Sequence, residues 1–124
     1  MKLLTVDDSL MIRRLIVETA QVINMESVTA KCAEDAITIL EREGSNISLI
    51  LLDWNMPGMS GYDLLKVIKA DPRWSQIPVM MVTSESYKTQ VIMAIKAGAA
   101  GYLMKPFAQQ DLATKILQCL GLGT

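Results

Sequence analysis

Short apolar runs alternate with stretches of helical hydrophobic periodicity along the chain. The runs are too short for helices and predict buried strands, whereas apolar residues at helical spacing predict amphipathic helices between them. The predicted strands span residues 2–6, 28–30, 48–52, 79–82 and 100–104. The predicted helices span residues 10–23, 34–42, 61–70, 87–97 and 108–120. Each predicted strand is therefore followed by a helix.

This alternation predicts an α/β fold, (βα)5, in which a doubly wound parallel five-stranded sheet carries helices on both faces. Five strands in such a sheet suggest the order 2-1-3-4-5. Ser9 is a predicted N-cap, and Ser60 with Asp63 three positions later suggests a variant capping box. Residues 121–124 form a short tail, so residues 1–124 are expected to be one domain.

Three carboxylates follow two of the predicted strands. Asp7 and Asp8 come directly after the first strand, and Asp53 comes directly after the third. Ligands of such sheets bind beyond the carboxyl ends of the strands, where the strand order reverses, so these acids should converge there. A single aspartate at a strand end is about as often a helix cap, but three together repel one another and favour a bound cation. Carboxylate ligation with retained water suits Mg²⁺.

Two further side chains should reach the same edge of the sheet. Thr83 follows the fourth strand and offers a hydroxyl, and Lys105 follows the fifth strand and offers a positive charge. In isolation the threonine would be read as a cap and the lysine as a surface residue. Together with three acids they are suited to phosphoryl transfer onto a carboxylate, because hydroxyl, ammonium and metal can all stabilise phosphoryl oxygens.

Composition narrows the choice of chemistry. The chain has no histidine, which excludes Ser-His-Asp and Cys-His nucleophiles, a His-ligated zinc site and a histidine phosphodonor within it. Twelve basic and 13 acidic residues give a formal net charge of −1, which argues against a nucleic-acid binder and against a polybasic membrane patch.

No apolar run approaches the ~20 residues of a membrane span. An early pair of aspartates argues against a signal peptide, and Cys32 and Cys119 are far apart in the sequence, so a cytoplasmic protein with reduced thiols is expected.

Four sequence elements in order resemble the receiver domain of two-component response regulators, most closely the stand-alone, CheY-like chemotaxis type. They are Asp7-Asp8, the LLDWNMPGMSG segment at residues 51–61, Val82-Thr83-Ser84, and the GYLMKPF segment at residues 101–107. The resemblance implies a flavodoxin-like three-layer sandwich, whose strand order is itself known from flavodoxin and from a chemotaxis response regulator. It also implies a phosphorylation-activated signalling switch rather than an enzyme.

The resemblance assigns roles to individual residues. It implies that Asp53 accepts the phosphoryl group, and that Asp8, Asp53 and the backbone carbonyl of Asn55 bind Mg²⁺, with Asp7 acting mainly through water. Thr83 and Lys105 would then contact the phosphoryl group, and the Lys105–Pro106 peptide bond would be cis. The residues expected to tune dephosphorylation are Asn55 and Glu85.

The resemblance also implies partners. The phosphodonor would be a sensor histidine kinase or a histidine phosphotransfer protein, and a downstream target would read the surface of the fourth helix, fifth strand and fifth helix. Thr83 and Tyr102 would be the switch pair, and the candidate target-binding residues are Val91, Ile95 and Tyr102. Ile12 and Leu15 lie on a first helix that is apolar over a wide arc, which indicates either a donor-docking surface or a helix wedged in the core. The unphosphorylated protein is expected to be a monomer with no output domain, no nucleic acid and no membrane.

Alternatives remain at this stage. The chain could pass its phosphoryl group on to a histidine phosphotransfer protein as a phosphorelay intermediate. A Mg²⁺-dependent phosphatase with an aspartate nucleophile is a different class, disfavoured because Asn55 stands where a second acid would be expected. A flavin-binding protein is disfavoured because acids follow the first strand, where a phosphate would bind. A receiver that works without phosphorylation is disfavoured because no site residue is missing.

Overall fold

The computed structural model describes residues 1–122 and places five parallel strands in one sheet. The strand order is β2-β1-β3-β4-β5, which confirms the predicted order. The strands are β1 (Lys2–Val6), β2 (Glu26–Ala30), β3 (Ile47–Leu52), β4 (Val79–Thr83) and β5 (Gly101–Met104). The helices are α1 (Leu10–Val22), α2 (Ala33–Glu43), α3 (Gly61–Ala70), α4 (Lys88–Lys96) and α5 (Gln109–Cys119), with a short 3-10 helix, η1 (Gly44–Asn46). Residues 123–124 of the predicted tail lie outside the described part.

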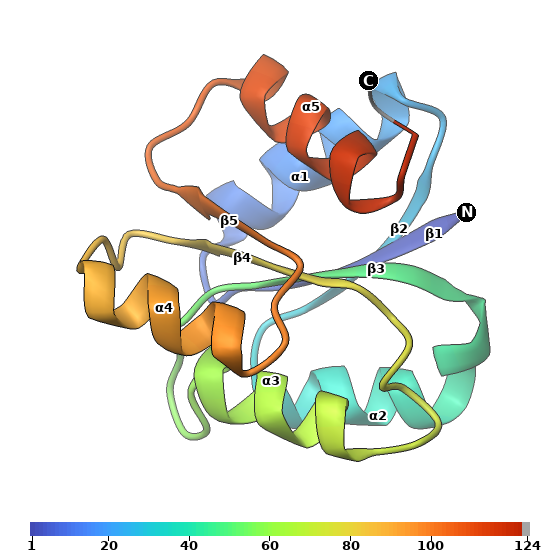
Figure 1. The fold of residues 1–124 in the computed structure, drawn as a ribbon. Coiled ribbons are helices and arrows are strands. Elements are labelled where there is room, and N and C mark those ends of the chain that lie inside the picture. The colour runs from blue at the N-terminus through green and yellow to red at the C-terminus, as the bar shows by residue number, and fades with distance from the viewer. Residues whose placement is uncertain (123–124) are drawn as a thin grey trace.

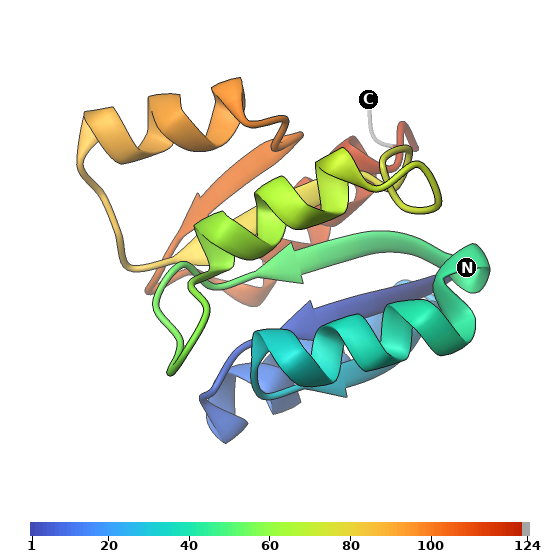
Figure 2. The ribbon, with the colours of Figure 1, turned by 90° about the horizontal axis from the view of Figure 1, so that it is seen from below.

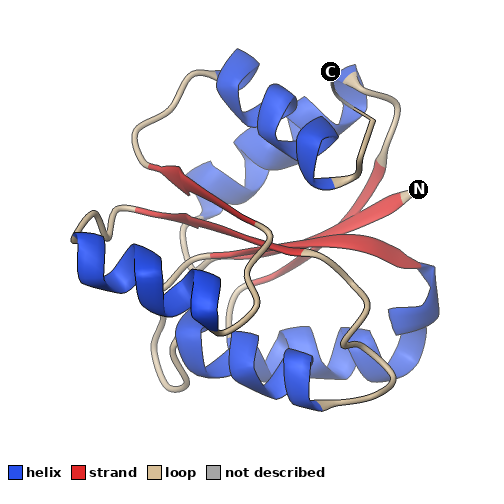
Figure 3. Cartoon of the chain, viewed as in Figure 1, coloured by secondary structure: helices blue, strands red, loops and turns tan. Residues whose placement is uncertain are grey.

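Helices cover both faces of the sheet. Helices α1 and α5 lie on one face, and α2, α3 and α4 lie on the other (Figure 1). The same three layers appear when the ribbon is coloured by secondary structure (Figure 3). Successive side chains of a strand point to opposite faces, so the two layers of helices need mostly apolar residues along the central strands. The apolar runs from which the strands were predicted meet this requirement.

The strand residues divide into two cores accordingly. Leu4, Ile50 and Met81 pack with α2, α3 and α4, whereas Leu3, Leu49 and Met80 pack with α1 and α5. All six side chains are essentially inaccessible to solvent. Complete burial of such a side chain stabilises a fold by about 1.5–3 kcal/mol. The two cores therefore hold the strand ends, and the loops that follow them, in fixed positions.

Two local predictions differ from the structure. Strand β2 begins at Glu26 rather than at residue 28, because Glu26 and Ser27 pair with β1 through their backbones although their side chains are not apolar. The Ser60 hydroxyl caps α3 by accepting from the Asp63 N–H at 3.1 Å. The Asp63 carboxylate, however, pairs with Lys66 at 3.3 Å rather than completing a capping box. The Ser9 cap is confirmed, since its hydroxyl accepts from the Ile12 N–H at 3.3 Å.

Candidate functional site

The acidic residues meet because β1 and β3 are neighbours in the sheet. Val6 is paired with Leu52, and the Asp53 N–H extends this pairing by donating to the Val6 carbonyl at 3.0 Å. The strands point their carboxyl ends toward one edge, where the green loop after β3 begins (Figure 2). One carboxylate oxygen from each of Asp7, Asp8 and Asp53 lies within 4.8 Å of the others. Asp7 and Asp53 are buried, whereas Asp8 is exposed.

Lys105 brings a positive charge into this cluster from the far side of β4. Its Nζ donates to Asp7 Oδ2 at 2.7 Å and to Asp53 Oδ2 at 3.2 Å. The backbone N–H of Lys105 donates to the Thr83 carbonyl at 3.0 Å, and the Lys105–Pro106 peptide bond is cis. Burial alone would lower the pKa of Lys105, but the hydrogen bond and charge of Asp7, with the charge of Asp53, outweigh it and raise that pKa. Lys105 is therefore a permanent cation at neutral pH.

Asp7 is the acid most strongly enclosed by protein groups. Burial, which disfavours the charged form, raises its pKa, although the Lys105 ammonium and the Ser9 N–H at 2.9 Å both oppose the change. Its backbone carbonyl accepts from the Arg13 guanidinium at 2.7 Å. Arg13 lies in the first turns of α1, and its side chain turns back and fixes the β1–α1 loop.

The donor set fits a hard divalent cation. Three carboxylates face one ammonium group, so the pocket retains excess negative charge when all four groups are ionised. Like charges at this separation are stabilised by a cation, and a site built from carboxylate oxygens suits Mg²⁺. The acids at the carboxyl ends of β1 and β3 therefore form a candidate Mg²⁺ site.

Thr83, Glu85 and Tyr102 form a second group beside the acids. The buried Thr83 hydroxyl accepts from the Glu85 N–H at 3.3 Å, so its own proton remains free to be donated. The Tyr102 hydroxyl donates to the Glu85 carbonyl at 2.6 Å. Burial raises the pKa of Tyr102, and the charges of Glu85 and Asp53 raise it further. The backbone of Glu85 therefore connects the two residues assigned to the switch.

The β3–α3 loop closes over this edge of the sheet. The Gly61 N–H donates to the Trp54 carbonyl at 2.8 Å, and a Cβ at Gly61 would lie 1.8 Å from the Asp53 carbonyl oxygen. Only glycine allows this approach, a requirement that was not recognised when Gly61 was read simply as the start of a helix. The exposed Asn55 side chain donates its amide N–H to the Glu85 carboxylate. This bond links the two positions expected to tune dephosphorylation.

The predicted docking residues differ in how far they are exposed. On α1, Ile16 and Ala20 enter the core, while Ile12 and Leu15 are partly buried and Leu10 and Met11 are exposed. The core interpretation of α1 is therefore confirmed for Ile16 and Ala20, whereas the donor-docking interpretation of its outer part stays a prediction. On α4, Ala94 is buried, Val91 is partly buried, and 56% of Ile95 is exposed.

Comparisons with known proteins agree with this arrangement. The family model of the response regulator receiver domain matches residues 3–117. Chemotaxis protein CheY1 of Helicobacter pylori is 42% identical over 123 residues, with 98% of each chain covered. Chemotaxis protein CheY of Pseudomonas aeruginosa is 43% identical over 117 residues, covering 94% of this chain and 93% of the relative.

Solved structures show the same fold. CheY4 of Vibrio cholerae has a TM-score of 0.89 at 29% identity, covering 96% of this chain and 98% of that one. The BeF3-activated DrrB receiver domain has a TM-score of 0.85 at 27% identity, covering 97% of each chain.

The chain belongs to the response regulator receiver domain family. It is a CheY-like signalling phosphoacceptor rather than a catalytic enzyme, and membership implies a histidine kinase as phosphodonor. Within residues 1–122, no helix has the length and apolar character needed to cross a bilayer.

Proposed function

We propose that Asp53 is the phosphoacceptor and that Mg²⁺ is held by Asp8, Asp53 and the Asn55 backbone carbonyl, with Asp7 acting through water. The main support is the meeting of four charged side chains: three carboxylates within 4.8 Å of one another and the Lys105 ammonium between Asp7 and Asp53. When bound, the metal supplies positive charge that offsets the charge of the incoming phosphoryl oxygens.

The side chains of this chain have separate tasks in the transfer. An Asp53 carboxylate oxygen forms the new bond to phosphorus as the bond from phosphorus to the donor histidine breaks. Lys105 Nζ already lies 3.2 Å from Asp53 Oδ2, so it is placed to donate to a phosphoryl oxygen there. Thr83 provides a second donor, because the N–H of Glu85 leaves its hydroxyl proton free. These donors stabilise the phosphorylated form more than the unphosphorylated one.

This difference in stabilisation is what shifts the conformation. Movement of Thr83 toward the phosphoryl group would act on Glu85, whose N–H and carbonyl bind Thr83 and Tyr102 respectively. The surface of α4, β5 and α5 would then be read by a target, through Val91, Ile95 and Tyr102. A ligand or modification shifts such an equilibrium only through contacts that differ between the two states. Ile12 and Leu15 of α1 would contact the phosphodonor.

The names of its relatives support a setting for the protein. The names of two relatives more than 40% identical to this chain describe chemotaxis proteins, which supports a chemotaxis-type output. We infer that residues 1–124 act as one receiver domain in the cytoplasm, monomeric before phosphorylation, and that output passes through a partner protein. The phosphodonor is a histidine kinase or a histidine phosphotransfer protein.

Phosphorylation by a small phosphodonor tests the acceptor directly. The wild-type protein is incubated with the donor in Mg²⁺ or in a chelator, and its intact mass is compared with that of D53N and of D111N, which changes an exposed aspartate on α5. We expect the mass of one phosphoryl group on the wild type and on D111N in Mg²⁺ only, and none on D53N. Equal labelling of D53N would show that the acceptor is another residue.

Capture of partners tests the switch. Beryllium fluoride-treated and untreated protein are each immobilised and exposed to a lysate, and Y102A is treated alongside. The proposal requires a target retained preferentially by the treated wild type, and equal retention by both forms would contradict it. Transfer of the phosphoryl group from Asp53 to a histidine phosphotransfer protein would instead establish a relay role.

A further inference from the structure

The β3–α3 loop is fastened at its base by two aromatic side chains whose significance was not apparent from the sequence. Trp54 follows Asp53 at the start of the loop, and Tyr62 stands just beyond Gly61 at its end. Their ring centroids are 4.9 Å apart, with 7° between the ring planes. This is the offset-stacked range of aromatic pairs, and it joins the two ends of the loop beside the Gly61–Trp54 backbone hydrogen bond.

A cation extends the stack along α3. Lys66 Nζ lies 4.6 Å from the centroid of the Tyr62 ring, one turn further along the helix, and pairs with Asp63 at 3.3 Å. A cation over an aromatic face is attracted to the negative face of the ring. Tyr62 is therefore held by α3 while it stacks on Trp54, so the rigid helix is connected to the start of the loop.

The residue that follows Trp54 is Asn55, whose carbonyl is assigned to the metal under the proposed function. The orientation of this carbonyl depends on the backbone torsions of Asn55 and of Trp54 before it, and the Trp54 side chain is held by the aromatic stack. From the other side, the Asn55 amide is bound to the Glu85 carboxylate. The residue before Asn55 and the Asn55 side chain are therefore both held.

We propose that Tyr62 is a positioning residue for Mg²⁺ binding, which acts by stacking on Trp54 and so orienting the Asn55 carbonyl. The proposal rests on the proposed function, because it presupposes a metal at the acidic cluster. Tyr62 contacts Trp54 and Lys66, and it would act on the metal only through Trp54 and Asn55. Its effect should appear in metal affinity before any phosphodonor is added.

The test compares Y62L with Y62F and V67A by titration calorimetry with Mg²⁺. Leucine keeps much of the apolar bulk but cannot stack, phenylalanine keeps the ring, and V67A alters a more exposed site on the same helix. We expect Y62L to weaken Mg²⁺ binding by about three- to tenfold, the effect of losing one aromatic pair. Y62F and V67A should stay within about twofold of the wild type.

A spectroscopic measurement separates positioning from a general loss of structure. In a W74F background Trp54 is the single tryptophan, so acrylamide quenching reports its exposure. Y62L should increase quenching of Trp54 without Mg²⁺, and Y62F should restore protection. Wild-type Mg²⁺ affinity in Y62L would overturn the inference, as would equal weakening in Y62L and Y62F.

The outcomes for the two proposals are distinguishable. If the wild type itself binds no Mg²⁺ and D53N is labelled like the wild type, the proposed function fails. If the wild type binds Mg²⁺ and only D53N escapes labelling, while Y62L binds the metal normally, the positioning role alone fails.

Discussion

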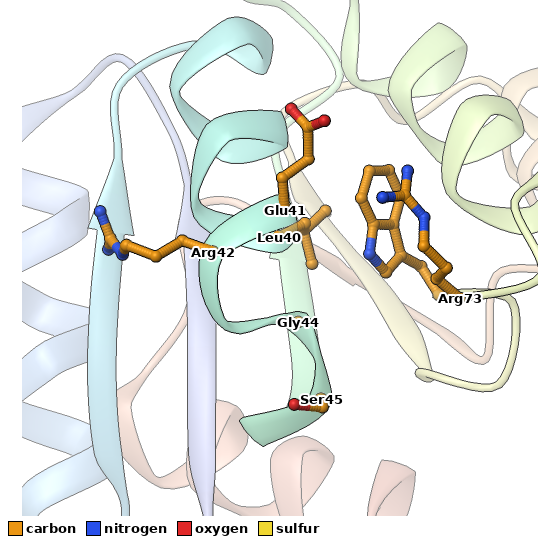
Figure 4. Close-up of a pocket in the computed structure, with 7 residues that line it drawn as sticks. Leu40, Glu41, Arg42, Gly44, Ser45 and Arg73 are labelled. Carbon is orange, nitrogen blue, oxygen red and sulfur yellow. The ribbon is translucent and has the colours of Figure 1, made fainter.

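The two edges of the sheet handle charge in opposite ways. At the amino ends of β3 and β4, a cavity of about 260 Å³ is lined by Leu40, Glu41, Arg42, Gly44, Ser45, Arg73 and Trp74 (Figure 4). Its arginines have acidic partners close in sequence: Arg42 pairs with Glu43, and Arg73 pairs with Asp71, both at 2.8 Å. Arg73 also lies over the Trp74 ring, 4.4 Å from the centroid.

At the carboxyl edge, by contrast, the charges come from three strand ends and do not balance. Asp7, Asp8 and Asp53 face Lys105, which is 98 residues from Asp7 in the chain. Two of these acids are buried, so the surrounding protein cannot screen them as water screens Glu43 or Asp71 at the other edge. An ion pair between residues close in sequence balances its own charge at the surface. A cluster that the fold assembles with more carboxylates than cations instead favours a bound cation.

The largest effect is expected at the carboxyl edge, from G61A. The new Cβ would meet the Asp53 carbonyl oxygen at 1.8 Å, and neither can rotate away, because the oxygen belongs to the backbone and the backbone fixes the position of a Cβ. We expect destabilisation by more than about 3 kcal/mol and loss of Mg²⁺ binding, as measured by urea unfolding and calorimetry.

The control is G58A in the same loop. Gly58 has a φ of +79° with nothing within 4 Å of the added Cβ, so alanine there costs only the strain of a left-handed backbone, about 1–2 kcal/mol. Similar stabilities of G61A and G58A would refute the close approach at Gly61.

A smaller effect is expected from K69M at the amino edge. Lys69 Nζ donates to the carbonyls of Ser75 at 3.1 Å and Ile77 at 2.6 Å, while its stem lies beside Gly98. Methionine keeps the stem and removes both donors, so we expect a loss of about 1–3 kcal/mol in the free energy of unfolding.

Phosphorylation of folded K69M should be unchanged, because Lys69 lies away from the acidic cluster. The exposed Lys96 provides the matched K96M control, which should be nearly neutral. A stability of K69M equal to that of K96M would mean that water replaces the lysine at both carbonyls.

The smallest effect is expected from E43Q. The hydrogen bond from Lys2, at 2.8 Å, lowers the pKa of Glu43, with Arg42 adding to the shift. A carboxyl whose folded pKa is lowered stabilises the fold above its unfolded pKa, and this contribution disappears as the pH falls through the folded pKa.

The stability difference between the wild type and E43Q should therefore be small at neutral pH and vanish in acid. It should also shrink in high salt, because this pair lies at the surface. Urea unfolding at neutral and acidic pH measures this difference in stability. The control is E34Q, which changes an exposed glutamate on α2. A difference that grows on acidification would contradict the assignment.

Much of the fold and of the acidic cluster could be predicted from the sequence. Apolar runs and helical periodicity located the strands and helices, and the strand order then placed Asp7, Asp8 and Asp53 together, because parallel strands end at one edge. The start of β2 was missed because backbone pairing, rather than an apolar side chain, places Glu26 in the sheet.

Other features depend on three-dimensional proximity that no periodicity encodes. The turn of Arg13 back to the Asp7 carbonyl, and the two carbonyls bound by Lys69, result from the paths of loops. The stacking of Trp54 on Tyr62 depends on how closely the ends of the β3–α3 loop approach, which Gly61 permits. A glycine between two aromatic residues near the acceptor was the one available signal in the sequence.

Calorimetric titration of Mg²⁺ into the wild type and D8N tests the central claim, that the carboxyl edge holds excess negative charge in need of a cation. Asp8 is exposed, so asparagine removes its charge with little disturbance of the core. D35N, at another exposed aspartate, is the control. The account predicts one site in the wild type and in D35N, weakened at least about tenfold in D8N, as expected for loss of a charged ligand. Equal affinity of D8N and the wild type would contradict it.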